Sequence, residues 1–345
     1  MNQLTLPPIL ITMIIGTLIT VTSDHWFVAW AGLELNTLAF LPILMNKADP
    51  RAAEATAKYF LAQAAAAAFV LFAAAMNAWY SGIWEIRHTL HPFNSVLFTL
   101  ALAFKMGLAP LHLWMPEVLQ GVNLPTGLIL CTWQKIAPFY LMMQLHFFMP
   151  IAITLGFVST FVGGWAGLDQ TQLRKLLAYS SISHLGWMLI VMQFSPLVSL
   201  IVLAVYLAMT AAIFLALALT NSTSINMLAT KSMKSVMISI TMPLVLLSLG
   251  GLPPLTGFLP KWLIIHELIG QSASLTAALL IPPALLNLYF YLRISYVTAL
   301  SLVPNNLTGT TAWRFQESKA SLPLTICVTA SLMVLPMAPA IVMFF

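Results

Sequence analysis

Two long apolar stretches of this chain are interrupted by nearly the same phrase. Residues 107–117 are GLAPLHLWMPE and residues 251–261 are GLPPLTGFLPK, so Gly-Leu-x-Pro-Leu-x-x-aromatic-x-Pro recurs and ends both times on a charged residue. Proline removes a backbone donor and clashes with the preceding turn, and glycine is a poor helix former. Each phrase therefore predicts a break in a helix that is otherwise apolar enough to cross a bilayer.

The composition places the whole chain in the membrane class. Apolar residues make up 60% of it and charged residues only 7%, which is more apolar surface than a soluble core could shelter. Its two cysteines, Cys131 and Cys327, are too few for an iron–sulfur cluster or a cysteine-based zinc site. Any redox cofactor is therefore expected on another chain.

The apolar segments predict an all-α polytopic membrane protein with about eleven crossings, at about 20 residues per crossing. The N-terminus has neither the basic start of a signal peptide nor the Arg-rich pattern of a transit peptide, so we expect it to begin the first crossing. The predicted helices span residues 3–22, 25–45, 56–80, 93–120, 124–147, 150–168, 174–193, 197–220, 235–270, 274–298 and 322–344.

The repeated phrase predicts an internal duplication within a single membrane domain, residues 1–345. Residues 3–147 would form one five-helix repeat, residues 150–298 a second, and residues 322–344 a final C-terminal helix. The broken helix is the fourth in each repeat, and because five is odd the second repeat should be inverted. Paired broken helices are typical of transporters, since the exposed backbone is tolerated only beside a polar cavity or against protein.

Basic residues fall mostly on one side of the predicted membrane. Basic loops stay on the side from which helices are inserted, so the N-terminus should face that compartment and the C-terminus the opposite one. The basic side has Lys47, Arg51, Lys58, Arg174, Lys175, Lys231, Lys234, Arg314 and Lys319, with Arg293 near a helix end, and the other side has Arg87.

Four charged residues lie near the middle of predicted crossings. They are Glu34, Lys105, Lys135 and Lys261, the last beside the second break. Each costs about 2.5 to 3.5 kcal/mol on insertion scales, which packing alone does not require. Burial lowers the pKa of an amine and a nearby carboxylate raises it again, so a change in their contact could shift a proton on or off the amine. The four charges therefore predict a proton relay. The alternative for any single lysine is that it extends along its helix to the interface.

Three further residues are weaker relay candidates. His112 lies between the prolines of the first phrase, where its imidazole could pass protons or simply be held by backbone oxygens. His184 follows Glu34 by 150 residues, at an equivalent place in the second repeat. Glu117 ends the first phrase as Lys261 ends the second, and either carries protons or reaches the interface.

The remaining titratable residues and motifs give little functional signal. Glu267 is either a partner of Lys261 or an interfacial anchor, and five histidines are expected at helix boundaries or in loops: His25, His88, His91, His146 and His266. Walker, GxGxxG, HExxH and Gly-x-Ser-x-Gly motifs are absent, so a self-contained hydrolase or dehydrogenase is not supported. Basic residues stand singly, which does not support nucleic-acid binding.

The charged motifs resemble those of a known family over the whole chain. WAGLELN around Glu34, FKMGLAPLHLWMPE around Lys105, TWQKIAP around Lys135, LLAYSSISHLGWM around His184 and LPPLTGFLPKW around Lys261 are similar to the antiporter-like subunits of respiratory complex I. These subunits are related to the Mrp cation/proton antiporters. Full-length members have fourteen helices, whereas this chain begins at what resembles the fourth, as mitochondrial members in animals do.

The resemblance implies a proton-translocating subunit of the membrane arm, driven by quinone reduction elsewhere in the complex. Glu34, Lys105, Lys135 and Lys261 would carry protons, and His112 and His184 would belong to the connecting polar axis. NADH, FMN, iron–sulfur clusters and ubiquinone would be bound by other subunits, and neither a cofactor nor a metal by this chain. The implied partners are subunits 4L and 4, accessory subunits and membrane lipids.

The implied location is the mitochondrial inner membrane, with the basic side and the N-terminus in the matrix and the C-terminus on the intermembrane-space side. Two other functions remain open at this point. An Mrp-type cation/proton antiporter component is disfavoured by the missing front helices. A purely structural spacer is disfavoured because apolar residues would serve it better than intramembrane charges.

Overall fold

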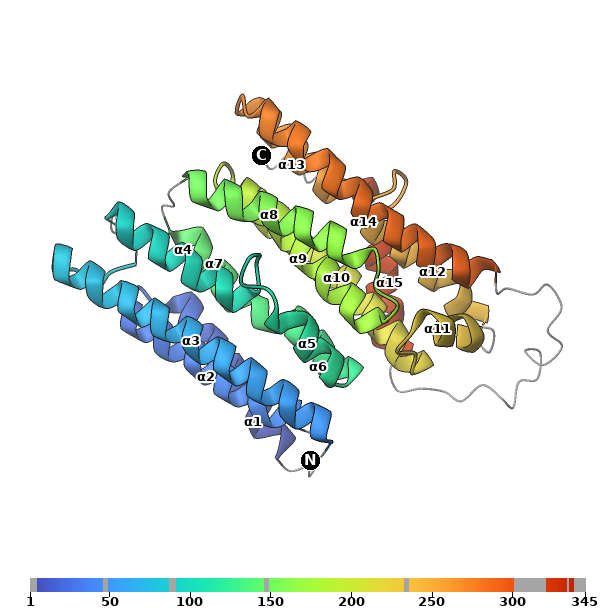
Figure 1. The fold of residues 1–345 in the computed structure, drawn as a ribbon, viewed down its shortest axis with the longest axis horizontal. Coiled ribbons are helices and arrows are strands. Elements are labelled where there is room, and N and C mark those ends of the chain that lie inside the picture. Colours follow the sequence, from blue (N-terminus) through green and yellow to red (C-terminus); the bar gives the residue numbers. More distant parts are fainter. Residues whose placement is uncertain are drawn as a thin grey trace. The chain divides into compact units, whose positions relative to one another are not determined.

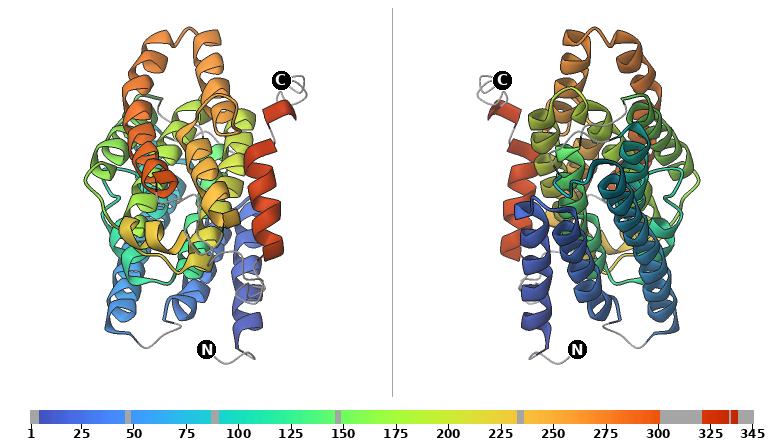
Figure 2. Two further views of the ribbon diagram at one scale, coloured as in Figure 1. Left: turned by 90° about the vertical axis from the view of Figure 1, so that its right-hand side faces the viewer. Right: turned by 90° about the vertical axis from the view of Figure 1, so that its left-hand side faces the viewer.

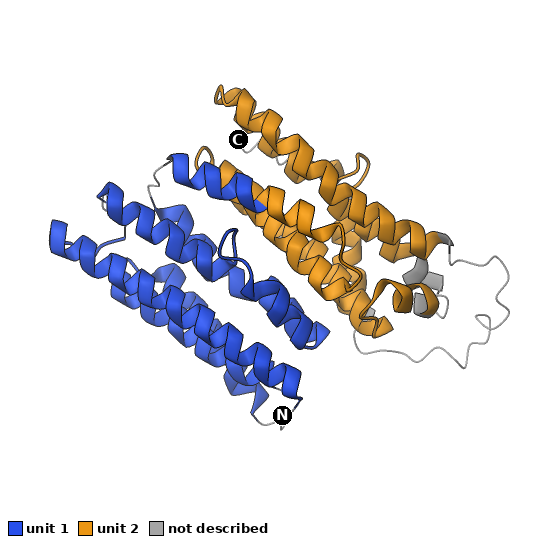
Figure 3. Ribbon diagram, in the orientation of Figure 1, with its two compact units in different colours: residues 1–159 blue, residues 160–345 orange. Residues whose placement is uncertain are grey.

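The computed structural model describes residues 5–45, 49–86, 91–145, 149–232, 236–300, 321–333 and 335–337. The chain forms two compact units, residues 1–159 and residues 160–345 (Figure 3). The boundary lies inside a helix, a few residues after the start of the second predicted repeat at residue 150. Several residues named above lie outside the described part of the chain: Lys47, Arg87, His88, His146, Lys234, Arg314 and Lys319.

Unit 1 is a bundle of helices that pack mainly against their neighbours in sequence. Helix α1 packs on α2, α2 on α3, and α3 on both α4 and α5, while α4 also contacts α7 (Figure 1). The helices are α1 (Leu6–Thr22), α2 (Trp26–Leu44), α3 (Pro50–Ser81), α4 (Pro92–Met106), α5 (Trp114–Gly121), α6 (Leu124–Cys131) and α7 (Trp133–Gln144); α8 (Met149–Gly167) crosses the boundary between the units.

Unit 2 is also helical. Helix α12 packs along α14, α10 contacts α9 and α15, and α13 and α14 form a hairpin (Figure 2). Its elements are α9 (Leu173–Met192), α10 (Pro196–Thr220), α11 (Ile225–Ser232), α12 (Val236–Gly250), α13 (Phe258–Gly270), α14 (Ser274–Leu300), α15 (Ser321–Met333) and the 3₁₀ turn η3 (Leu335–Met337).

Among the described residues, six helices are long and apolar enough to cross a membrane. They are α2, α3, α8, α9, α10 and α14, and four shorter apolar helices accompany them. Large apolar side chains such as Leu18, Leu61 and Leu285 are more than half exposed, as expected of a surface that faces lipid or other subunits. The all-helical class and a multi-pass membrane protein are therefore confirmed.

Both repeated phrases break their helices, as predicted. Helix α4 ends at Met106 and α5 begins at Trp114, while α12 ends at Gly250 and α13 begins at Phe258. The first residue of each phrase is a glycine with a left-handed backbone, φ +77° at Gly107 and +81° at Gly251. Glycine adopts this conformation without the steric cost that other residues meet, so it ends a helix cleanly.

A third break was not predicted. The segment expected as one helix over residues 124–147 is divided at Thr132, where α6 ends and α7 follows at once. The Thr132 N–H still bonds to the Leu128 carbonyl at 2.9 Å, but the Lys135 N–H bonds to the Thr132 carbonyl, three residues back, at 3.3 Å. Pro138, inside α7, lacks the N–H that would bond to the Gln134 carbonyl.

Two other elements differ from the prediction. Helix α3 begins at Pro50, whereas the predicted helix began at residue 56, and helix α11 lies in a segment that was expected to be a loop.

The two units contain the same local contacts at a constant spacing. In unit 1, Gly16 of α1 lies so close to α2 that a Cβ built on it would be 2.8 Å from the backbone nitrogen of Asn36. In unit 2, a Cβ built on Gly163 of α8 would likewise be 2.8 Å from the backbone nitrogen of Ser183 on α9. Gly163 follows Gly16 by 147 residues, and Ser183 follows Asn36 by the same number. Small residues at such crossings let two helices approach closely.

In each unit, an isolated antiparallel bridge joins two loops at matching places. The residue before α2, His25, is bridged to Glu85 after α3, and the residue before α9, Gln172, is bridged to Ser224 after α10. Gln172 again follows His25 by 147 residues. The helices before each phrase therefore also match one another, residue by residue, at a spacing of 147 residues. This match supports the duplication inferred from the two phrases.

Candidate functional site

The three mid-segment lysines all lie within one turn of a helix break. Lys105 is in the last turn of α4, Lys135 in the first turn of α7 and Lys261 in the first turn of α13. A helix end leaves backbone groups without intrahelical partners and concentrates the helix dipole. The breaks therefore place each lysine at a helix end within otherwise apolar segments.

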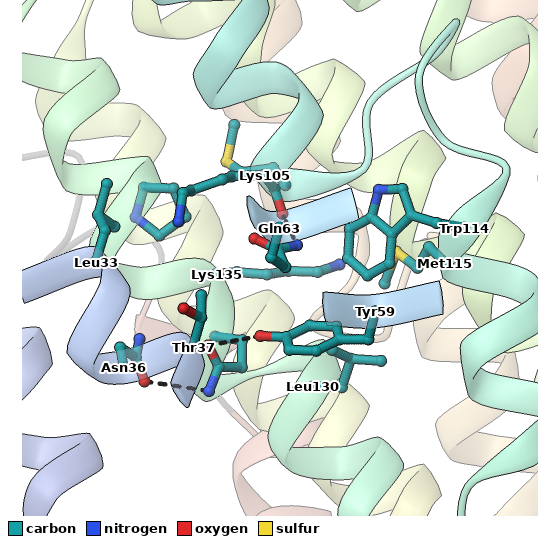
Figure 4. A pocket seen from close by; sticks show the side chains of 13 residues that line it. Leu33, Asn36, Thr37, Tyr59, Gln63, Lys105, Trp114, Met115, Leu130 and Lys135 are labelled. Atoms are coloured by element: carbon teal, nitrogen blue, oxygen red, sulfur yellow. Dashed lines mark hydrogen bonds between the residues drawn. The ribbon is translucent and has the colours of Figure 1, made fainter. Parts of the chain in front are cut away.

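Lys105 and Lys135 line one enclosed cavity in unit 1 (Figure 4). Their exposed fractions are 5% and 2%, so both are buried. The space open to the centre of a water molecule is about 10 Å³, which is near the lower limit for one water. Among the described residues, no group accepts a hydrogen bond from Lys105 Nζ. The structure thus brings together two of the four predicted relay residues.

Polar side chains that the sequence had not indicated join the two lysines around this cavity. Gln63 Nε2 donates to the Lys105 carbonyl at 3.1 Å. Tyr59 Oη donates to Gln134 Oε1 at 3.4 Å, and Gln134 Nε2 donates in turn to Asn36 Oδ1 at 3.1 Å (Figure 4). These bonds connect α2, α3 and α7. Buried polar networks of this kind hold their members in fixed positions when every partner is supplied.

Glu34 lies on α2 near this cavity without lining it. Its carboxylate Oε2 accepts a hydrogen bond from Thr37 Oγ1 at 2.8 Å, one turn along the same helix. The carboxylate is close enough to Lys105 and to Tyr59 for electrostatic interaction. Glu34 is half-buried and Lys105 is buried.

Lys261 has a different kind of partner in unit 2. Its Nζ donates to the Gly250 carbonyl at 2.6 Å, the carbonyl of the last residue of α12. A Cβ built on Gly251 would lie 2.8 to 2.9 Å from the Lys261 Cδ, Nζ and Cε atoms. The glycine therefore makes room for the ammonium as well as ending the helix. Glu267, the other partner considered, accepts from Gln271 Nε2 at 3.4 Å instead.

The structure places the two weaker histidine candidates in separate units. His112 lies between α4 and α5, with its Nδ1 3.3 Å from the Pro110 carbonyl oxygen. His184 lies on α9, with its ring centroid 5.6 Å from that of Tyr206 on α10. The spacing of 147 residues places Ser181, not His184, at the position of Glu34. His184 corresponds to Thr37, whose hydroxyl contacts the carboxylate.

Glu117 forms an ion pair that the sequence did not predict. Its Oε2 lies 2.7 Å from Lys58 Nζ, which also contacts Glu54 Oε1 at 2.6 Å. The three side chains are 41% to 64% exposed. The pair ties α5 to α3 on the far side of the first break, and neither residue lines the cavity.

The cavity brings two titratable amines together. An ammonium group can donate a proton and a neutral amine can accept one, so Lys105 and Lys135 supply the kind of group that proton transfer needs. Within the described ranges, no three His, Cys, Asp or Glu residues are grouped closely enough to hold a metal ion. His25 and His91 instead cap helices α2 and α4.

Comparisons with known proteins show the family of the chain. Residues 23–285 match the family model described as NADH:quinone oxidoreductase/Mrp antiporter, and residues 288–342 match the NADH dehydrogenase subunit 2 C-terminus. The chain is 54% identical to NADH-ubiquinone oxidoreductase chain 2 of Tetraodon nigroviridis, over 98% of this chain and 97% of that one.

Two solved structures have similar folds. Respiratory complex I from Thermus thermophilus contains a chain that matches with a TM-score of 0.84 and 26% identity, over 97% of this chain and 78% of that chain. A chain of the Mrp complex from Dietzia sp. matches with a TM-score of 0.76 and 17% identity, over 84% of this chain and 59% of that one.

Proposed function

Because the chain belongs to the family of NADH-ubiquinone oxidoreductase chain 2, we propose that it is a proton-translocating subunit of the membrane arm of respiratory complex I. In this role it contributes to the oxidoreductase without a redox centre of its own. NADH, FMN, iron–sulfur clusters and ubiquinone belong to other subunits, and quinone reduction there drives the protons here.

The observation that supports proton transfer most directly is the cavity shared by Lys105 and Lys135. Two buried amines line one water-sized space, and Glu34 is close enough to Lys105 for electrostatic interaction, so the protonation of Lys105 depends on its distance from the carboxylate. Lys261 continues the relay in the second repeat, where the Gly250 carbonyl holds it. His112 and His184 are supporting members, and Glu117 has a structural role through its pair with Lys58.

The repeat and its orientation are part of the same proposal. Eleven crossings, arranged as two five-helix repeats and a C-terminal helix, are supported by the two phrases and by the spacing of 147 residues between matching contacts. The second repeat is inverted, the N-terminus faces the matrix and the C-terminus the intermembrane space. The inner mitochondrial membrane is the location, and subunits 4L and 4 are the expected neighbours.

The test is neutralisation of the relay charges in the assembled complex. Glu34→Gln and Lys135→Met should lower proton pumping per NADH oxidised in vesicles, while the chain still assembles. Matched controls are Glu54→Gln and Lys175→Met, which neutralise the same kinds of charge outside the cavity. Full pumping by an assembled Glu34→Gln/Lys135→Met double variant contradicts the relay and supports a structural spacer instead.

An Mrp-type cation/proton antiporter component is the second candidate, because the matching family model includes both groups. It predicts sodium-dependent proton flux in vesicles that contain this chain without a quinone reductase. The identity to complex I subunits over nearly the whole chain favours the first function.

A further inference from the structure

A wide groove opens on unit 2 between helices α12 and α14. Its volume is about 590 Å³, and its walls are formed by Pro243, Leu247 and Leu252 on one side and by Tyr289 and Tyr296 on the other. Pro243 lies inside α12, where it removes a hydrogen bond and bends the helix. The two helices touch again at Gly250, where a Cβ would meet the Leu288 side chain at 2.8 Å.

Among the described residues that line this mainly apolar groove, one is charged. Arg293 lines it, and its Nη1 and Nη2 donate to the carbonyls of Leu168 and Gln170, each at 2.6 Å. Carbonyls are neutral, and its buried Nε has no hydrogen-bond partner among the residues that the structure describes. Within the described part of the chain, no carboxylate lies within ion-pair distance of the guanidinium. A half-buried arginine in a membrane helix favours a counter-charge.

The position of the groove along α14 fits a lipid. Its α14 residues run from Tyr289 to Ala299, about 15 Å at the helical rise, which is half of the hydrocarbon thickness. Tyr289 and Tyr296 are 59% and 65% exposed. Tyrosines of this kind are typical of the membrane interface, where headgroups lie.

We infer that this groove binds an anionic phospholipid, with its phosphate beside Arg293 and one acyl chain against Leu247 and Leu252. The charge selects the headgroup, and the apolar walls hold the chain. Basic pockets between membrane helices bind anionic headgroups elsewhere for the same electrostatic reason. The inference is independent of the proton relay, because neither Glu34 nor any of the three relay lysines lines the groove.

The test uses two photoreactive lipids in the purified complex. Phosphatidylglycerol and phosphatidylcholine, each with a diazirine on the same acyl chain, are exchanged into the complex, and cross-linked peptides are mapped by mass spectrometry. Phosphatidylglycerol should label residues 243–252 and 289–299 about fivefold more strongly, as expected for one arginine. Arg293→Lys should keep this preference, and Arg293→Gln should abolish it.

A second variant covers the case in which Arg293→Gln does not assemble. Leu247→Trp fills the groove without touching the charge, and should remove the labelling, whereas Leu285→Trp, at an exposed position of α14 outside the groove, should not. Equal labelling by both lipids in the unmodified complex overturns the inference in favour of unspecific lipid contact. No labelling of either segment overturns it in favour of a protein that covers the groove.

Discussion

Replacement of Gly251 by alanine tests whether the second break exists to place Lys261. The backbone there has φ +81°, which costs about 1–2 kcal/mol for a residue with a Cβ. The new Cβ would lie 2.8 to 2.9 Å from three atoms of Lys261, well inside the contact distance of about 3.5–4 Å. The lysine must therefore move away from the Gly250 carbonyl.

The expected size of the effect follows from the bond that is lost. A hydrogen bond to a charged group contributes about 1.5–3 kcal/mol. At about 1.4 kcal/mol for each factor of ten, the bonded conformer of Lys261 becomes roughly ten- to a hundredfold less populated. We expect proton pumping per NADH oxidised to fall by a similar factor if Lys261 carries protons, and the heat stability of the subunit in the complex to fall.

Gly82 provides a matched control. It also has a left-handed backbone, φ +70°, and a Cβ built there meets nothing within 4 Å. Gly82→Ala therefore introduces the backbone strain without displacing a side chain. If Gly251→Ala lowers pumping and stability no more than Gly82→Ala, the reasoning is refuted. The double variant Gly251→Ala/Lys261→Ala should be less destabilised than the two single effects added together, because alanine at position 261 lacks the Cδ, Cε and Nζ atoms that the new Cβ would meet.

Three other predictions concern unit 1. Gly16→Val should separate α1 from α2, because even a Cβ at Gly16 would lie 2.8 Å from the Asn36 nitrogen, and the subunit should be depleted from purified complex, as measured by mass spectrometry. Tyr59→Phe removes the donor to Gln134 and should lower stability by about 1 kcal/mol and pumping a few-fold, with unchanged NADH oxidation. Lys58→Gln should leave pumping nearly unchanged, since exposed ion pairs contribute little, and a large loss would instead give this pair a functional role.

The sequence predicted most of the helices because membrane crossings depend on local composition. Runs of about 20 apolar residues and the two Gly-Pro phrases are visible without any tertiary information. The break at Thr132 was missed, because residues 128–137 contain neither glycine nor proline, the two residue types that marked the other breaks. This break changes the surroundings of Lys135, because the lysine lies in the first turn of α7 and not within a continuous helix.

The sequence by itself determined which residues are candidates for the relay. A charge within an apolar segment is costly wherever the helix packs, so Glu34 and the three lysines stand out from their local surroundings alone. The family was equally visible in the motifs around them. The equivalence of Glu34 and His184 was three residues out of register, because the matching contacts of α1 with α2 and of α8 with α9 recur at a spacing of 147 residues, not 150.

Tertiary structure alone decided which groups meet. Lys105 and Lys135 come from α4 and α7, and the amides that surround them come from α2, α3 and α7, so their shared cavity depends on how these helices cross. The amides of this network carry no charge and cost little to bury once they are hydrogen-bonded. The sequence therefore gives no signal that singles out Asn36, Gln63 and Gln134. The bond from Lys261 to Gly250 likewise arises only when the chain folds back across the break.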